Sequence, residues 1–237
     1  MRKPALLLCG CFLGAWTLNQ AAAHDLWLES EADGYVLYQG HRHSSHDGEE
    51  IVPYDPSFTR RAVCLHADGR AAPLPLAEVY PARFAGPCDG LLVEVSSGTW
   101  TTTTQGTRNQ PPDGLTGVVR SWQTLETVKR IDAWSESMQQ PAGDALELVP
   151  RNDPLALRPR DKLRLLVTLE GEPQAGVTVA YDGEPRGVTG ADGLINLRIR
   201  REGRQLITAS TRTPADEPGI DHVLHAATLH FDLQGTQ

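Results

Sequence analysis

Three histidines fall within six residues of one another, in the sequence GHRHSSHDGEE at positions 40–50. If an extended strand runs into this segment, His41 and His43 lie on the same side of the chain, because strand side chains alternate with a period of two. Two imidazoles at that spacing can bind one metal ion, and a turn at Ser44-Ser45 could bring His46 to it. Imidazole suits zinc, copper, nickel and iron, and the three acids that follow would add negative potential. The alternative is a solvated hairpin tip, since Ser, Asp and Gly are common turn residues.

The first 23 residues have the pattern of a secretory signal peptide. A basic start, Met1-Arg2-Lys3, precedes an apolar run over residues 5–16 and three alanines at 21–23. The apolar run is shorter than the about 20 residues that a transmembrane helix requires, and no later segment approaches that length without charges. We therefore expect export to a bacterial periplasm, cleavage after Ala23 and no membrane-spanning segment in the mature protein. The alternative is a lipid anchor on Cys11, because residues 8–11 resemble a lipobox.

Cleavage after Ala23 would make His24 the N-terminal residue of the mature chain. The α-amine and Nδ1 of His24 could then close one chelate ring on a metal ion. The α-amine has an ordinary pKa of about 8, so a metal ion competes readily with its proton at neutral pH. The alternative is that His24 is simply the residue that follows the signal peptide.

The chain is acidic, with a formal net charge of −8 at pH 7. An acidic surface argues against nucleic acid as a partner and suits a protein that meets cations. Cys9 and Cys11 would leave with the signal peptide, so Cys64 and Cys88 remain. An even number of cysteines in an exported chain predicts a disulfide bond between these two.

Short alternating runs bounded by Gly, Pro, Asp and Asn dominate the sequence, and they predict an all-β protein. The alternation is clearest at Leu163, Leu165, Val167 and Leu169. Residues 123–133 are expected to form a strand, with a short helix as the alternative. A stretch rich in Pro, Gly and charge over residues 140–162 indicates a boundary. We predict two β-sandwich domains in tandem, a metal-binding domain at 24–150 and a smaller sandwich at 151–237.

Other residues point less specifically to a function. No motif of a serine hydrolase, a zinc protease or a phosphate- or dinucleotide-binding loop occurs, so we expect a binding protein and not an enzyme. The histidines of the last predicted strand are expected at surface or edge positions, with His225 as the one that could contribute a ligand. These histidines are His222, His225 and His230.

Two alternative function classes stay open. Four tryptophans could form the surface of a carbohydrate-binding or adhesion module, although aromatic residues more commonly anchor sandwich cores. The second alternative is a copper redox enzyme that holds its metal in a brace-like site at the N-terminal histidine. The four tryptophans are Trp27, Trp100, Trp122 and Trp134.

Several short motifs resemble one exported protein family: His24-Asp25-Leu26-Trp27-Leu28-Glu29, Tyr38-Gln39-Gly40-His41 and Pro53-Tyr54-Asp55-Pro56. That family is associated with nickel and cobalt uptake, as the soluble partner or extracytoplasmic domain of energy-coupling-factor-type transporters. Residues 176–179 and 189–193 resemble the immunoglobulin-like or carboxypeptidase-regulatory-like module with which the family ends. The resemblance implies a periplasmic protein that captures nickel or cobalt and assists its uptake by a membrane transporter.

The resemblance implies a ligand role for His24 and His41, whereas His43 and His46 follow from their spacing alone. Together these four histidines predict a site for a divalent transition metal ion. Ligand chemistry by itself favours copper over nickel or cobalt, and zinc is also compatible with it. The choice of nickel or cobalt therefore rests on the resemblance.

Overall fold

The computed structural model describes residues 25–40 and 51–234 of the 237-residue chain. Nearly every element in these ranges is a strand, and the two short 3-10 helices there are η1 (Pro56–Phe58) and η2 (Glu136–Gln139). The prediction of an all-β protein is confirmed. No helix in the described ranges is long and apolar enough to cross a membrane.

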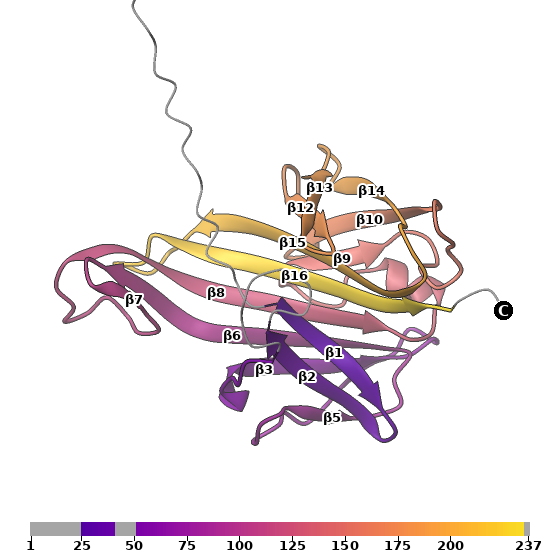
Figure 1. Ribbon diagram of the computed structural model, residues 1–237, viewed down its shortest axis with the longest axis horizontal. Helices are drawn as coiled ribbons and strands as arrows, with labels where there is room; N and C mark the ends of the chain where they lie inside the picture. The colour runs from indigo at the N-terminus through magenta and orange to yellow at the C-terminus, as the bar shows by residue number, and fades with distance from the viewer. Residues whose placement is uncertain (1–24, 41–50, 235–237) are drawn as a thin grey trace, which may run out of the picture.

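The largest sheet has nine strands, and its four longest strands, β6, β8, β15 and β16, run side by side across the molecule (Figure 1). Neighbouring strands in it are antiparallel, except that β8 and β16 are parallel. In sheet order the strands are β13 (Glu184–Val188), β12 (Thr178–Tyr181), β15 (Gly203–Pro214), β16 (His222–Leu233), β8 (Val118–Ile131), β6 (Gly90–Thr103), β3 (Thr59–Leu65) and β4 (Ala71–Pro73), with β7 (Gly106–Arg108) paired to β6.

Two smaller sheets accompany the nine-stranded sheet. The three-stranded sheet is formed by β1 (Asp25–Glu31), β2 (Gly34–Gly40) and β5 (Arg83–Ala85). The four-stranded sheet is formed by β9 (Glu147–Pro150), β10 (Lys162–Leu169), β11 (Glu172–Pro173) and β14 (Leu194–Arg198).

Strand β3 shows how one sheet serves two hydrophobic cores. Ala62 and Cys64 pack into a cluster that contains residues of β1 and β2. Val63 and Leu65 pack into a second cluster that contains residues of β10 and β14. Because successive strand side chains point to opposite faces, the three-stranded sheet covers one face of the nine-stranded sheet and the four-stranded sheet covers the other.

Strand β16 connects the N-terminal and C-terminal parts of the chain within one sheet. It pairs with β8 from His222–Trp122 to Phe231–Ile131, and it pairs with β15 along its whole length. The nine-stranded sheet is therefore continuous across residue 150. The division into domains at 24–150 and 151–237 stays a prediction, as does the signal peptide at 1–23, which lies outside the described residues.

Two further predictions are confirmed. The segment 123–133 falls largely within β8, so it is a strand and not a short helix. Cys64 and Cys88 form a disulfide bond, which links β3 to the segment before β6.

Candidate metal-binding site

The four predicted metal ligands lie outside the described residues, which begin at residue 25 and exclude 41–50. The structure does describe the residues that adjoin them. In the β1–β2 hairpin, Asp25 pairs directly with Gly40. Gly40 also forms a bridge with Ile51, and the backbone N–H of Val52 donates to the carbonyl of Gln39 at 2.7 Å. The described residues on the two sides of positions 41–50, Gly40 and Ile51, therefore lie next to each other, beside the start of β1.

A pair of carboxylates lies close to this place. Glu126 of β8 is half-buried, and burial together with the nearby charge of Asp25 raises its pKa to about 7. Glu126 lies on the face of the nine-stranded sheet that β1 and β2 cover, because it alternates in phase with Val128 of that core cluster. The start of β1 thus lies in a region of negative charge.

The middle of β1 is anchored by Arg130 of β8. Its guanidinium donates to the backbone carbonyl of Leu28 at 3.3 Å and to Asp132 and Asp232 at 2.7 to 3.0 Å. Burial by itself lowers the pKa of Arg130, but the two carboxylates outweigh this effect and raise it. Arg130 Nη1 also lies 3.3 Å from Nδ1 of His230, so this histidine takes part in the anchor.

The expectation of surface or edge positions is wrong for two of the three histidines of β16. His225 and His230 are only 7% and 0% exposed, whereas His222 is half-buried. The reason is that β16 is an inner strand, flanked by β15 and β8. The pairing of β16 with β8 therefore determines the burial of these histidines, which the local sequence could not show.

The four tryptophans do not form one exposed aromatic face. Trp27 is buried and stacks on Tyr38. Trp134 packs against the core cluster between the nine-stranded and the four-stranded sheets. Trp100 and Trp122 are directly opposite each other in β6 and β8 and are half-buried. With two of the four in or against the cores, the structure offers little support for a sugar-binding surface built on all of them.

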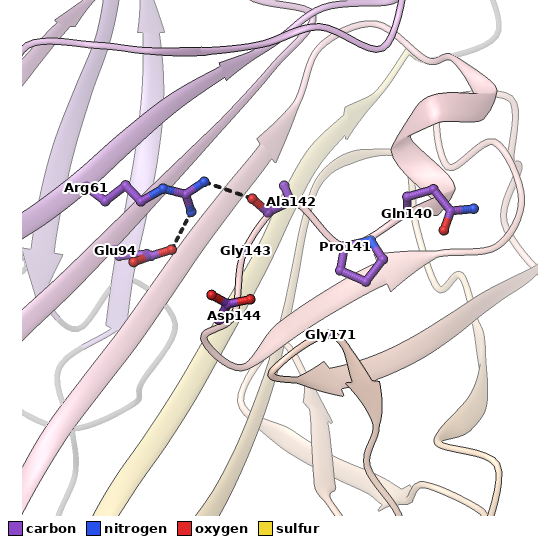
Figure 2. A pocket seen from close by; sticks show the side chains of 8 residues that line it. All are labelled: Arg61, Glu94, Gln140, Pro141, Ala142, Gly143, Asp144 and Gly171. Carbon is purple, nitrogen blue, oxygen red and sulfur yellow. Dashed lines mark hydrogen bonds and ion pairs between the residues drawn. The ribbon is translucent and has the colours of Figure 1, made fainter.

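Another group of charged residues serves to hold a loop. Arg61 and Glu94 line a groove of about 650 Å³. The guanidinium of Arg61 contacts Glu94 at 2.6 Å and donates to the carbonyl of Ala142 at 3.0 Å, and both interactions are drawn in Figure 2. Lys129 and Glu147 form a further ion pair at 2.7 Å, with both side chains only 1% exposed. Glu147 also accepts a hydrogen bond from the backbone N–H of Ala142. These contacts attach the segment 140–147 to the sheet.

No sequence signal predicted the Lys129–Glu147 pair. Lys129 and Glu147 are 18 residues apart, and their strands do not pair with each other. A charged residue in a strand is ordinarily placed on the solvent side. Only the packing of the segment 140–147 over β8 shows that both charges are enclosed.

Among residues 25–40 and 51–234, no group of three or more His, Cys, Asp or Glu side chains could hold a metal ion. The four-histidine site stays a prediction, with the paired strand ends and the nearby carboxylates as its described surroundings. No curated protein matches this chain. Residues 21–213 match the family described as a domain of unknown function, DUF4198, and the chain belongs to that family.

Proposed function

We propose that the protein is an exported, periplasmic protein that binds a divalent transition metal ion and does not catalyse a reaction. The proposed ligands are His24, His41, His43 and His46. The observation that supports this best is the pairing of Asp25 with Gly40, because these two residues are bonded to His24 and His41. Ligands 17 residues apart in the sequence thus adjoin one pair of residues in the β1–β2 hairpin.

The open end of the β1–β2 hairpin, where Asp25 pairs with Gly40, has surroundings that suit a cation. We call this place the hairpin end. Asp25 and Glu126 bring two carboxyl groups to it, and the closeness of Asp25 already disfavours ionisation of Glu126. A bound divalent cation would relieve this repulsion, because an opposite charge within a few ångströms favours the ionised form of a carboxyl group. We infer that these carboxylates attract and steer the metal ion and that the imidazoles and the α-amine bind it.

The proposed cargo is nickel or cobalt, and the proposed partner is a membrane transporter that takes up the metal. Both rest on the resemblance of the sequence motifs. A nitrogen-rich site of this kind binds copper more tightly than nickel or cobalt by intrinsic affinity. A binding assay must therefore include copper and zinc as competitors. Delivery to a transporter also requires that the bound metal ion be exchangeable.

Calorimetric titration of the chain that begins at His24 tests the proposal, with Ni²⁺, Co²⁺, Cu²⁺ and Zn²⁺ in separate runs. We expect one site per chain with a dissociation constant below about 10 μM, which corresponds to a binding free energy of about −7 kcal/mol. The replacement His41→Ala should weaken binding at least tenfold. His66→Ala is the matched control, because His66 lies in the loop between β3 and β4 and is not one of the proposed ligands.

A second chain with one residue added before His24 separates the parts of the site. The addition removes the α-amine from its chelating position, so we expect weaker binding that still depends on His41. Equal binding by both chains would show that the N-terminal chelate is wrong while a site exists. Absence of binding by the chain that begins at His24, for all four metals, would refute the proposed function.

A further inference from the structure

Three aromatic side chains stand in a row at the end of the nine-stranded sheet, where β6, β8 and β16 extend past the β1–β2 hairpin (Figure 1). Trp100 of β6 is directly opposite Trp122 of β8, and Trp122 is directly opposite His222 of β16. Paired residues of neighbouring strands place their side chains on one face of the sheet, so the three rings share a face. We call these three residues the aromatic row.

The aromatic row lies on the face that β1 and β2 cover, beyond the hairpin end. Trp122 alternates in phase with Glu126, which lies on that face. Arg130 contacts Leu28 and Glu126 lies near Asp25, so β8 passes the start of β1 before it reaches Trp122. No residue of the row is a proposed metal ligand, and the inference drawn from the row is independent of the proposed function.

Two arginines flank the aromatic row. The guanidinium carbon of Arg120 lies 5.1 Å from the ring centre of Trp122, in a cation–π contact. Arg212 of β15 is in phase with Pro214, the residue that pairs with His222, and its charge acts on the pKa of His222. Both arginines are exposed, and neither has a carboxylate partner among the described residues. In a chain with a formal net charge of −8, this pair of cations attracts an anion.

The polar atoms of the row are also open to a ligand. Trp122 and His222 stack with ring centres 6.2 Å apart and an angle of 7° between their planes. The indole N–H of Trp122 and the ring nitrogens of His222 have no hydrogen-bond partner in the described part of the chain, and they are not shielded from solvent. Trp100 differs, because its indole N–H donates to Oγ of Ser97 at 2.8 Å.

The protonation of His222 defines what a ligand must offer. Burial and the charge of Arg212 lower the pKa of His222, and Arg120 adds to this effect. Asp221 opposes the shift without reversing it, so the ring is neutral at neutral pH. In either tautomer a neutral imidazole has one N–H donor and one acceptor nitrogen. A hydroxyl group, which both donates and accepts, satisfies either nitrogen.

The two arginines are set apart along the sheet. Arg212 is level with Thr124 of β8, because both pair with Leu224 of β16. Arg120 comes four residues before Thr124 in β8, which is about 13 Å of strand. A chain with carboxylates at more than one place therefore suits these arginines better than a single compact anion.

We propose that the aromatic row, with Arg120 and Arg212, binds an acidic oligosaccharide, a chain of pyranose rings that carry carboxylates. The planar guanidinium groups match planar carboxylates in shape and charge. The apolar C–H groups of the sugar rings pack on Trp100 and Trp122, and a sugar hydroxyl bonds to His222. This ligand has the negative charge, the hydroxyl groups and the apolar faces that the five side chains require.

The test is an NMR titration of the mature chain with trigalacturonate at pH 7.5, in EDTA so that no metal ion takes part. We expect the indole N–H resonance of Trp122 to move and saturate, because this group gains an acceptor. Two probes each lack one feature of the ligand. Maltotriose has three sugar rings without charge, and triglutamate has carboxylates without sugar rings, so each should bind at least about tenfold more weakly.

Variants locate the site on the aromatic row. Arg120→Gln and Arg212→Gln should each weaken the binding of trigalacturonate about threefold, in the range of solvent-exposed charge interactions. His222→Phe keeps an aromatic ring in the stack and removes both nitrogens, so it should weaken binding about fivefold. Arg164→Gln is the matched control and should leave binding unchanged, because Arg164 is exposed in β10 of the four-stranded sheet.

Three results would overturn the proposal. The first is that trigalacturonate leaves the Trp122 resonance unmoved. The second is that maltotriose or triglutamate binds as tightly as trigalacturonate, which would indicate general sugar or general anion binding. The third is that Arg164→Gln weakens binding as much as Arg120→Gln does. Vesicles of phosphatidylglycerol are the competing ligand: if the chain binds them through Arg120 and does not bind trigalacturonate, the face belongs to a membrane surface instead.

Discussion

Glu126 shows how the fold alters the chemistry of an ordinary carboxyl group. Its pKa is raised to about 7 by burial first and by the charge of Asp25 second. In an unfolded chain a glutamate titrates at about 4.3. The folded state therefore holds its proton more tightly, so the stability that this proton contributes is present below about pH 4 and is lost as the pH rises through 7.

The substitution Glu126→Gln tests this effect directly. At pH 8.5 it should raise the free energy of unfolding by about 1–3 kcal/mol, because the amide has the shape of the carboxyl group and does not ionise at this half-buried position. At pH 4, where the carboxyl group is mostly protonated in both states, the change should be small. Urea unfolding at both pH values, in the presence of EDTA, measures the difference.

Glu78→Gln is the matched control for this substitution, since Glu78 is exposed and should show no such dependence on pH. An equal effect of Glu126→Gln at pH 4 and pH 8.5 would mean that packing and not ionisation is responsible.

At the scale of elements, the β1–β2 hairpin determines where the predicted ligands adjoin the fold. Its turn depends on Gly34, which has a φ of +148° and pairs with Ala85 of β5. A Cβ at this position would lie 2.1 Å from the carbonyl oxygen of Phe84. No side chain fits there unless β2 and β5 separate.

Gly34→Ala should therefore lower the free energy of unfolding by about 2–4 kcal/mol, as the sum of an unfavourable backbone conformation and a clash with backbone. Gly183→Ala is the comparison, because Gly183 also has a positive φ, of +75°, but a Cβ there would meet no atom within 4 Å. Its cost should be about 1–2 kcal/mol, from the backbone conformation alone. Thermal unfolding followed by circular dichroism ranks the two variants.

Hydrogen exchange adds a local measurement for the same pair of variants. Loss of protection in Gly34→Ala should concentrate in β1, β2 and β5. If both glycine variants lose the same stability, the close approach of Gly34 to Phe84 is not a determinant of the hairpin.

For the whole molecule, the main feature is that the C-terminal strand completes a sheet begun by N-terminal strands. Strand β16 lies between β8 and β15. The core cluster under the four-stranded sheet combines residues from both parts of the chain, namely Val63, Ile131, Leu165 and Phe231. Removal of the residues after 150 would expose the edge of β8 and one face of the sheet. Unpaired edges and uncovered apolar faces promote aggregation.

We therefore expect that a chain of residues 24–150 does not fold on its own. Its amide NMR spectrum should have poor dispersion, and it should bind a hydrophobic dye that the chain of residues 24–237 does not. A well-dispersed spectrum and a cooperative thermal transition for residues 24–150 would instead support the predicted division into two tandem domains. The longer chain, prepared in the same way, is the reference for both measurements.

Much of this structure could be predicted because strands leave a local signal. The alternation at Leu163, Leu165 and Val167 predicts a strand with one buried face, and all three side chains are fully buried in β10. The disulfide followed from the even number of cysteines that remain after the predicted signal peptide. Both inferences depend on properties that neighbouring residues or simple counts already contain.

What the tertiary structure decided depends on contacts between distant parts of the chain. The burial of His225 and His230 arises because β8, about 100 residues earlier, pairs with β16. The ion pair of Lys129 with Glu147, the raised pKa of Glu126 beside Asp25 and the meeting of Asp25 with Gly40 have the same origin. The sequence by itself determined the all-β class, the disulfide and the choice of histidines to consider. Only the tertiary structure decided which charges are enclosed and which strand ends meet, because burial and electrostatic interaction depend on distance in space and not on separation along the chain.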